Sequence, residues 1–172
     1  MTIHAFSSLK GFYPFIKKFS YFFAAVLFVG ISTQTALQAQ EYDKSIGLRY
    51  GSTKGVSFKG FMNEATAFEG MVVYHRDGFR GIALIEQHIS PGRNSNTLLY
   101  AGIGGYAGVT ALLDEFPGQN NVAGLTAIIG FEYVLPRSNV SFAFDLNPAY
   151  ELIQDTGLSA NQAAVSLRYL ID

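Results

Sequence analysis

The sequence predicts an all-β protein, an eight-stranded antiparallel up-and-down transmembrane β-barrel that follows an N-terminal signal peptide. Composition is the first observation behind this prediction, because 15 Phe, 10 Tyr and 18 Gly residues accompany only five Pro, and this mixture favours strands and turns over helices. The second observation is that eight segments alternate apolar and polar residues with a period of two, which indicates strands with two different faces. The third is that most links between these segments are short enough for hairpins.

The first 39 residues have the order of a secretory signal peptide. Two lysines precede an apolar run from Phe19 to Ile31, and a polar stretch follows that ends at Ala39. The apolar run has thirteen residues, fewer than the roughly 20 that a membrane-spanning helix needs. We therefore expect residues 1–39 to be a cleaved signal peptide and residues 40–172 to form the barrel, with a retained anchor as the alternative.

Charge and cysteine content exclude several classes of protein. Loss of residues 1–39 removes three of the twelve Lys and Arg residues and none of the thirteen Asp and Glu residues, which leaves nine bases against thirteen acids and a net charge of −4. Such a chain is not expected to bind nucleic acid. The sequence contains no Cys, which excludes disulfides, thiolate metal sites, a cysteine nucleophile and a lipoprotein anchor.

The alternating segments divide residues 40–172 into eight expected strands. The fourth is ambiguous, because its apolar face contains either Phe79, Ala83 and Ile85 or Ile82 and Leu84, and a β-bulge would allow both. Pro148 has no N–H to donate within a sheet, so we expect it near a rim or a bulge. The expected strands are residues 43–51, 55–62, 66–75, 79–88, 97–111, 122–135, 140–152 and 162–171.

The two faces of these strands differ strongly in charge, which bears on the orientation of the barrel. A water-soluble barrel hides its apolar face, whereas an outer-membrane barrel turns that face to lipid and keeps polar residues inside. Phe142, Phe144 and Leu146 share one parity, and a Lys or Arg on such a lipid-facing surface would cost about 2 to 4 kcal/mol at the bilayer midplane. We therefore expect the charged residues to form ion pairs in the lumen. The lumen residues are Arg49, Lys59, Glu69, Glu132, Asp145, Glu151 and Arg168.

An outer-membrane orientation also assigns the loops. Both ends of the barrel chain would be periplasmic, and the longer outer loops would be residues 111–122 and 153–161. Shorter outer turns would lie near residues 52–55 and 76–79. The link at residues 89–96 is long for a periplasmic turn. The two longer loops are the expected contact surfaces for an extracellular or envelope partner, because loops vary and carry function on rigid scaffolds.

The carboxy-terminal half resembles small outer-membrane β-barrel proteins that are common in the Bacteroidetes. The resemblance covers about 75 residues from Leu98 onward and depends on three elements: Ile129-Gly130-Phe131-Glu132-Tyr133, Asp145 with Pro148, and Arg168-Tyr169. It implies export to a Gram-negative outer membrane, contact with outer-membrane lipid and insertion by the barrel insertion machinery. Few members of this group have a defined activity. The chain departs from their usual aromatic end, because it finishes Leu170-Ile171-Asp172.

Two motifs suggest chemistry that their surroundings do not support. Residues 102–107 read GIGGYA and match a dinucleotide-binding fingerprint, but no βαβ pattern surrounds them and no acid follows about 20 residues on. We expect Gly102, Gly104 and Gly108 instead to make room for Tyr100 and Tyr106 or to relieve barrel curvature.

The second motif is His88-Ile89-Ser90, which resembles the His-x-Ser element of outer-membrane lipid A deacylases. It implies that His88 would activate Ser90. That family takes its acid from the following strand, where this chain has Tyr100, Gly102 and Gly104, and a third group is needed to orient the histidine. We therefore expect no enzyme activity, with a lipid A deacylase-like hydrolase as the alternative.

No cofactor or metal site is expected. His75 and His88 are predicted at opposite ends of the barrel, too far apart to bind one metal ion. Glu132 and Asp145 could act as an acid–base pair, but beside Arg49 or Arg168 they more often form interior ion pairs. The expected role is structural or interactive. The alternatives are a lipid-modifying enzyme and a soluble lipocalin-like barrel that binds an apolar ligand.

Overall fold

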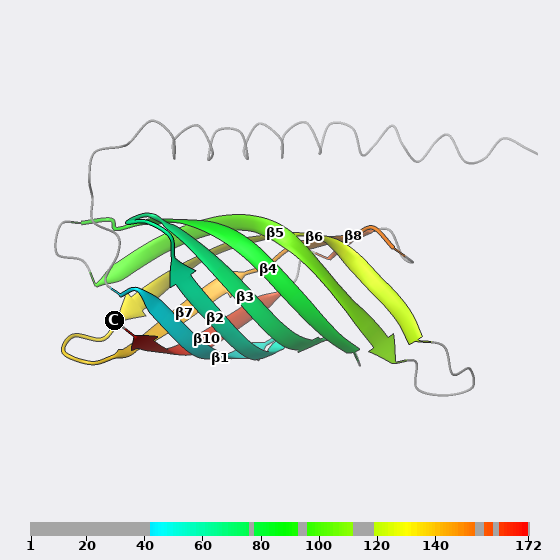
Figure 1. Ribbon diagram of the computed structural model, residues 1–172, viewed down its shortest axis with the longest axis horizontal. Coiled ribbons are helices and arrows are strands. Elements are labelled where there is room, and N and C mark those ends of the chain that lie inside the picture. The colour runs from blue at the N-terminus through cyan, green and yellow to red at the C-terminus, as the bar shows by residue number, and fades with distance from the viewer. Residues whose placement is uncertain are drawn as a thin grey trace, which may run out of the picture. The chain divides into compact units, whose positions relative to one another are not determined.

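A single antiparallel sheet contains all the strands of the computed structural model (Figure 1). The structure describes residues 42–75, 78–92, 96–111, 119–153, 157–159 and 162–171. The predicted signal peptide, residues 1–39, lies outside these described residues. Over the same ranges, no helix is long and apolar enough to cross a membrane.

Ten strand segments make up the sheet. Most bounds follow the expected ranges closely, although β6 begins at Gln119 rather than at residue 122. The expected strand at residues 140–152 is divided into β7 and β8, and β9 lies where a loop was expected. The segments are β1 (Lys44–Gly51), β2 (Lys54–Phe61), β3 (Thr66–His75), β4 (Gly78–Ile89), β5 (Thr97–Ala111), β6 (Gln119–Val134), β7 (Val140–Leu146), β8 (Ala149–Glu151), β9 (Gly157–Ser159) and β10 (Ala163–Ile171).

The sheet closes on itself. Consecutive strands pair from β1 to β7, β7 pairs with β10, and β10 returns to β1. The short β8 continues β7 along β6 in unchanged register, because Ala149 lies opposite Thr126 and Leu146 lies opposite Ile129. With β7–β8 and β9–β10 each counted as one strand, the fold is a closed eight-stranded antiparallel barrel. The predicted all-β barrel is confirmed, and the described residues contain no helix.

Pro148 lies between β7 and β8, at a change of register with the neighbouring strand. Leu146 pairs with Ala163 and Ala149 pairs with Ser159, so the pairing advances three residues on one side and four on the other. One extra residue on one strand is the defining count of a β-bulge. The carbonyl of Pro148 still accepts a hydrogen bond from the N–H of Ala127 at 3.0 Å. The expected position of Pro148 near a bulge is confirmed.

The register of β4 resolves the ambiguity in the fourth expected strand. Its twelve residues alternate strictly between buried and exposed, and its pairing with β3 continues in one register from Thr66↔Gln87 to His75↔Gly78. Phe79 and Ile85 face outward, whereas Ile82 and Leu84 are buried inside. No bulge is needed, because β4 carries apolar residues on both faces.

Apolar side chains fill the two stretches of the lumen that the charged residues leave. One cluster, formed by large residues of β3, β4, β5 and β6, contains Met71, Ile82, Leu84, Tyr100 and Tyr106. The other lies at the end of the barrel where β1 begins and β10 ends. Its members are Tyr42, Leu98, Val134 and Leu170, with Phe61 packed against them.

Glycines allow β4, β5 and β6 to approach closely. A Cβ on Gly104 would lie 1.8 Å from the carbonyl oxygen of Ala83, so this position tolerates no side chain. The space for the tyrosine rings comes from another strand, since Gly124 faces the Tyr106 ring and Gly130 faces the Tyr100 ring. Gly104 is therefore explained by the close approach of the β4 backbone and not by space for the tyrosine rings. Relief of barrel curvature by the β5 glycines stays a prediction.

Candidate functional site

The seven charged residues predicted for the lumen all lie on the polar parity of their strands, which faces the barrel interior. This follows from the strict alternation of strand side chains. Six are buried, and Glu151 is partly exposed, with 21% of its side chain accessible. They are Arg49 on β1, Lys59 on β2, Glu69 on β3, Glu132 on β6, Asp145 on β7, Glu151 on β8 and Arg168 on β10.

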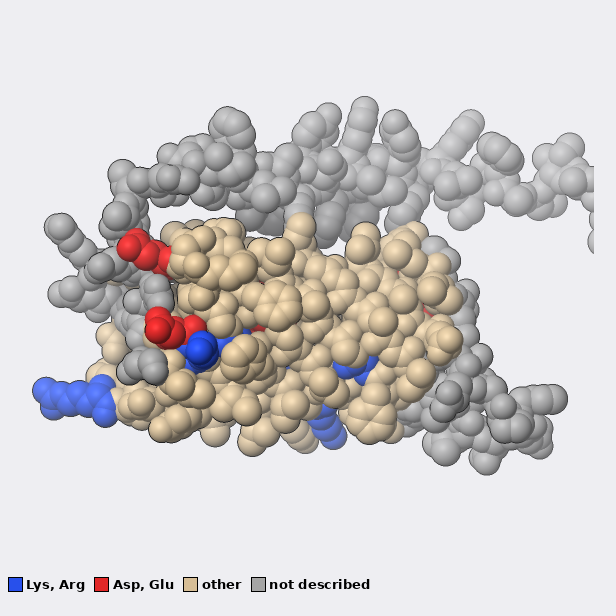
Figure 2. All heavy atoms as spheres, in the orientation of Figure 1, with Lys and Arg blue, Asp and Glu red and all other residues tan. Residues whose placement is uncertain are grey.

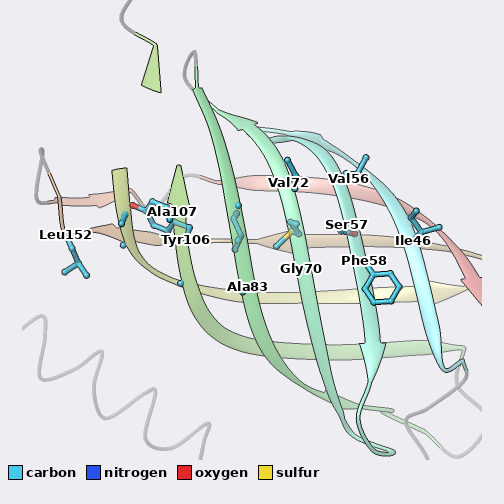
Figure 3. Close-up of a pocket in the computed structure, with 16 residues that line it drawn as sticks. Ile46, Val56, Ser57, Phe58, Gly70, Val72, Ala83, Tyr106, Ala107 and Leu152 are labelled. Carbon is cyan, nitrogen blue, oxygen red and sulfur yellow. The ribbon is translucent and has the colours of Figure 1, made fainter. Parts of the chain in front are cut away.

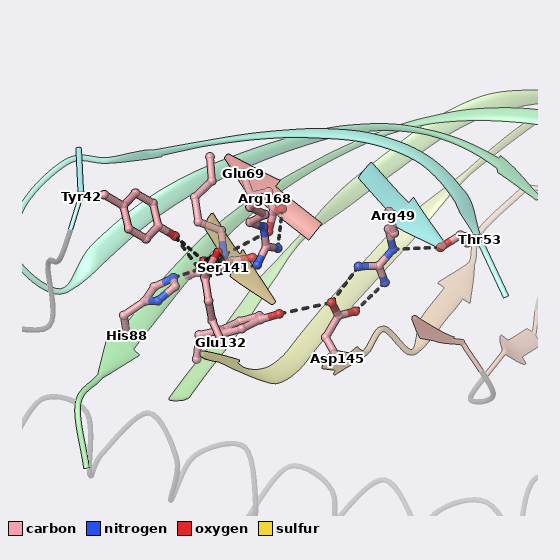
Figure 4. Close-up of polar contacts among 12 residues, drawn as sticks. Tyr42, Arg49, Thr53, Glu69, His88, Glu132, Ser141, Asp145 and Arg168 are labelled. Carbon is pink, nitrogen blue, oxygen red and sulfur yellow. Dashed lines mark hydrogen bonds and ion pairs between the residues drawn. The ribbon is translucent and has the colours of Figure 1, made fainter. Parts of the chain in front are cut away.

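Four of these residues form a central cluster across the lumen. The guanidinium of Arg168 donates hydrogen bonds to Glu69 at 2.9 Å and to Glu132 at 3.2 Å. The ammonium of Lys59 lies 3.3 Å from Glu69 and 3.9 Å from Glu132. The side chains converge from β2, β3, β6 and β10, and Figure 4 shows the Arg168 contacts among them. The cluster therefore ties opposite walls of the barrel together.

Glu132 also accepts hydrogen bonds from two hydroxyl groups. The Tyr42 hydroxyl lies 3.1 and 3.0 Å from its two carboxylate oxygens, and the Ser141 hydroxyl donates to Oε1 (Figure 4). Two donors in addition to Arg168 and Lys59 leave this buried carboxylate well satisfied. Such satisfaction offsets much of the cost of removing a charge from water.

A second ion pair joins Arg49 and Asp145. The guanidinium binds the carboxylate through two hydrogen bonds, of 2.8 and 2.5 Å, the bidentate geometry that makes Arg–carboxylate pairs strong. The Arg49 Nε donates to the hydroxyl of Thr53 at 3.0 Å. Figure 4 shows this pair beside the central cluster rather than within it.

Tyr100 connects the two groups of charges. Its hydroxyl donates to Asp145 at 3.2 Å, while the Lys59 ammonium lies 4.3 Å and the Arg168 guanidinium 5.9 Å from its ring centroid. Cations in this position are attracted by the ring quadrupole. The sequence gives Tyr100 the inward parity of β5, but neither its hydrogen bond nor its ring contacts were predicted.

Three further polar residues line the lumen from β4, and none was predicted as part of the network. Arg80 lies 3.6 Å from Glu151 and 4.9 Å from the centroid of the Tyr106 ring. Glu86 lies 2.8 Å from the Lys59 ammonium, and the third residue, His88, lies 3.0 Å from Glu86. Their shared parity with Ile82 and Leu84 was the available signal, but the ambiguous face of this strand concealed it.

His88 and Ser90 do not form the hydrogen-bonded pair that the deacylase alternative requires. His88 Nε2 lies 3.0 Å from the carboxylate of Glu86, and its ring stacks on Tyr100 at 5.2 Å. The Ser90 hydroxyl donates instead to the carbonyl of Gly92 at 2.9 Å. Both side chains are buried, so this arrangement offers no exposed histidine-activated serine.

The side chain of His75 lies outside the described residues. Among the part of the chain that is described, no group of three or more His, Asp or Glu side chains is placed to hold a metal ion. The contact loops predicted at residues 111–122 and 153–161 are partly strand, because β6 begins at Gln119 and β9 is Gly157–Ser159. Most of the other residues of these two loops lie outside the described ranges.

The outer surface contrasts with the lumen. Phe144 and Leu167 are 40% and 45% exposed, whereas their chain neighbours Asp145 and Arg168 are 0% and 1% exposed. Large apolar side chains are exposed on every long strand, among them Ile46, Phe58 and Leu125. The face shown in Figure 2 consists mainly of uncharged residues.

A shallow apolar groove of about 850 Å³ lies on the outer surface and is lined by residues of β1 to β6 and by Leu152 (Figure 3). The strands contribute consecutive residues whose middle member points inward, as in the triplet Val56-Ser57-Phe58. Small residues form its floor, because longer outward side chains are missing there. The floor residues are Gly70, Gly81, Ala83, Gly105, Ala107 and Ala123.

No family model, curated protein or solved structure matches this chain. The properties of the lumen are therefore argued from the residues of this chain alone. Buried ion pairs fill the lumen over several residue layers, and the apolar cluster around Tyr42 and Leu98 occupies one end. Among the described residues, side chains therefore occupy the lumen, as the narrow interior of an eight-stranded barrel allows.

Proposed function

We propose that this chain is a small non-porin outer-membrane β-barrel with a structural or surface-interaction role. The observation that carries the proposal is the distribution of charge between the two faces. On outward positions of the strands, as far as their side chains are described, Lys44 and Lys54 are the only charged residues, and each begins its strand. Nine other charged side chains of these strands point into the lumen.

Lipid contact accounts for this distribution better than water does. A Lys or Arg at the bilayer midplane of a barrel costs about 2 to 4 kcal/mol, and this cost falls to about 0 to 1 kcal/mol near the interfaces. The positions of Lys44 and Lys54 agree with this dependence on depth, because both lie at strand ends, where the cost is small. A water-facing surface would instead favour charged side chains over exposed Phe, Leu and Ile.

Aromatic residues near one rim support the same proposal. The Lys54 ammonium lies 5.1 Å from the centroid of the Tyr50 ring, and Lys54 is paired across the sheet with Tyr74. The Tyr74 ring makes an edge contact with Phe79 at 5.4 Å. Aromatic side chains with a cation at a barrel end are typical of the interface between hydrocarbon and headgroups.

We further propose that the barrel belongs to the Bacteroidetes type of outer-membrane protein, exported by residues 1–39 and assembled by the barrel insertion machinery. The support is the sequence resemblance, whose elements lie on β6, on β10 and around β7 and Pro148. An extracellular or envelope partner would bind through residues 111–122 and 153–161. We propose no catalytic role, because Ser90 and His88 contact other groups.

Cell fractionation tests the localisation. The full chain should be recovered in the outer-membrane fraction of a Gram-negative host, require detergent for extraction, and migrate faster on gels before boiling than after it. Recovery in the soluble periplasmic extract without detergent would contradict the proposal and favour the soluble ligand-binding barrel. A Ser90→Ala variant measured alongside should leave lipid A acylation unchanged.

A further inference from the structure

Two buried carboxyl groups, Glu69 and Glu86, each have one oxygen that accepts no hydrogen bond. The Oε2 of Glu86 contacts both Lys59, at 2.8 Å, and His88, at 3.0 Å, while its Oε1 has no hydrogen-bond partner. The Oε1 of Glu69 accepts from Arg168 at 2.9 Å, while its Oε2 accepts no hydrogen bond and lies 3.3 Å from the Lys59 ammonium. Both side chains are completely buried and contact the same ammonium. They are diagonal neighbours on the inward face of β3 and β4, because Glu86 pairs with Ala67 and Leu84 pairs with Glu69.

The ionic balance of the lumen points to the same pair. Arg49 is matched by Asp145, and Arg80 by Glu151. Together with Glu86, the central cluster has the cations Lys59 and Arg168 but three carboxyl groups, so full ionisation leaves one negative charge in excess. An uncompensated charge in such a place is strongly destabilising, and buried carboxyl groups commonly avoid this cost by binding a proton.

His88 is a poorer carrier of the missing positive charge. A protonated imidazole would have an N–H on Nδ1, and this atom has no partner in the structure. The ring also lies in the field of Lys59 and Arg168, two cations that disfavour a third. As a neutral ring, His88 can donate from Nε2 to Glu86 and leave Nδ1 without a proton.

We propose that Glu69 and Glu86 share one bound proton, with Glu86 un-ionised and its Oε1–H donating to Oε2 of Glu69. This proton gives a hydrogen bond to both oxygens that otherwise have none, and it makes the central cluster with Glu86 neutral without a bound cation. The proposal concerns the lumen and holds whether the outer surface contacts lipid or water. The groups that face Glu86 are Lys59 from β2, Glu69 from β3, His88 from β4, Tyr100 from β5, Glu132 from β6 and Arg168 from β10.

Infrared spectroscopy of the folded full barrel tests the proposal directly. At neutral pH the wild-type protein should show the carbonyl stretch of an un-ionised carboxylic acid, which shifts when the side-chain carboxyl groups are labelled with ¹³C in glutamate only. Glu86→Gln should remove this band, and Glu151→Gln, at the partly exposed carboxylate, should retain it. Absence of the band in the wild type, or its persistence in Glu86→Gln, would overturn the proposal.

One further measurement uses only the wild-type protein and does not depend on the folding of any variant. Nitrogen-15 spectra of wild-type His88 should show a neutral ring, and a signal from a protonated ring would overturn the assignment.

Urea unfolding compares the two carboxyl groups. Glu86→Gln should unfold at nearly the wild-type urea concentration, because its amide N–H can donate to Glu69 in place of the proton. Glu69→Gln should unfold at a clearly lower concentration, because Arg168 and Lys59 lose a carboxylate. Equal loss in both variants would contradict the shared proton.

Discussion

Arg49 and Asp145 illustrate at the scale of single residues how the barrel accommodates charge. Their two hydrogen bonds place a bidentate ion pair in the lumen, where the Thr53 hydroxyl accepts from Arg49 and the Tyr100 hydroxyl donates to Asp145. Removal of one partner leaves the other charge buried without its counter-ion, which is far more costly than removal of both. The contribution of Arg49 to stability therefore depends on Asp145, and that of Asp145 depends on Arg49.

We predict that Asp145→Ala lowers the free energy of unfolding by about 3 to 5 kcal/mol, the usual cost of breaking a buried ion pair. Urea unfolding of the folded barrel in detergent micelles or lipid vesicles measures the loss. Lys54→Ala, at the exposed rim, is the matched control and should change stability by less than about 0.5 kcal/mol. An equally small effect at Asp145 would contradict the ion-pair account.

The double variant Arg49→Leu with Asp145→Leu tests the coupling between the two residues. Its loss of unfolding free energy should be smaller than the sum of the losses in Arg49→Leu and Asp145→Leu measured separately, because neither charge is then left unpaired. Simple additivity of the two losses would show that the residues act independently.

Side-chain parity predicted which residues face the lumen, but not which residues touch. Arg168 and Glu69 are 99 positions apart in sequence and meet at 2.9 Å, and such contacts across the lumen depend on the tilt and curvature of the closed sheet. Glu86 and His88 were missed for a different reason. Because β4 has Ile82 and Leu84 inside and Phe79 and Ile85 outside, its hydrophobic pattern did not distinguish the two faces.

At the scale of the elements, β5 and β4 depend on glycine for their close approach. Gly104 leaves no space for a Cβ beside the Ala83 carbonyl, whereas a Cβ on Gly81 would lie 3.8 Å from the carbonyl oxygen of Ala107, an ordinary van der Waals distance. The two glycines lie on neighbouring strands and face opposite sides of the barrel wall. Substitution of these two glycines by Ala therefore compares a position without space for a Cβ with a position that has such space. The loss of glycine's backbone flexibility is common to both substitutions.

We predict that Gly104→Ala destabilises the barrel by about 3 kcal/mol or prevents its folding, at the upper end of the cost of overpacking. Gly81→Ala should stay within about 0.5 kcal/mol of the wild type, as at an open surface position. Refolding yield and urea unfolding provide the measurement. Equal tolerance at both sites would contradict the close approach of the two strands.

Strand bounds were predictable from sequence because period-two alternation continues almost to each strand end. The exception is the last third of the chain. The expected strand at residues 140–152 is interrupted at Pro148, and β9 lies within residues 153–161, which were expected to be a loop. Pro148 indicated an irregularity, since it has no N–H for the ladder. The register change beside it depends on the neighbouring strand and was not predictable from Pro148 alone.

For the whole molecule, the filled lumen determines what the barrel can pass. The central ion cluster, the Arg49–Asp145 pair and the apolar cluster at one end occupy successive levels of the interior. We predict no stepwise conductance when the purified barrel is added to a planar lipid bilayer, under conditions in which a known porin gives clear steps. Stable open-channel steps would show that the interior is wider than these contacts allow.

Contact between the outer surface and lipid acyl chains can be measured directly by tryptophan fluorescence, because the sequence contains no Trp. Single tryptophans placed by Leu167→Trp and Phe144→Trp should be strongly quenched in vesicles of lipids brominated on their acyl chains, because both sites face outward. Tyr106→Trp, inside the barrel, should be quenched little. Equal quenching at inner and outer sites, or a barrel that stays in the aqueous phase, would contradict lipid contact.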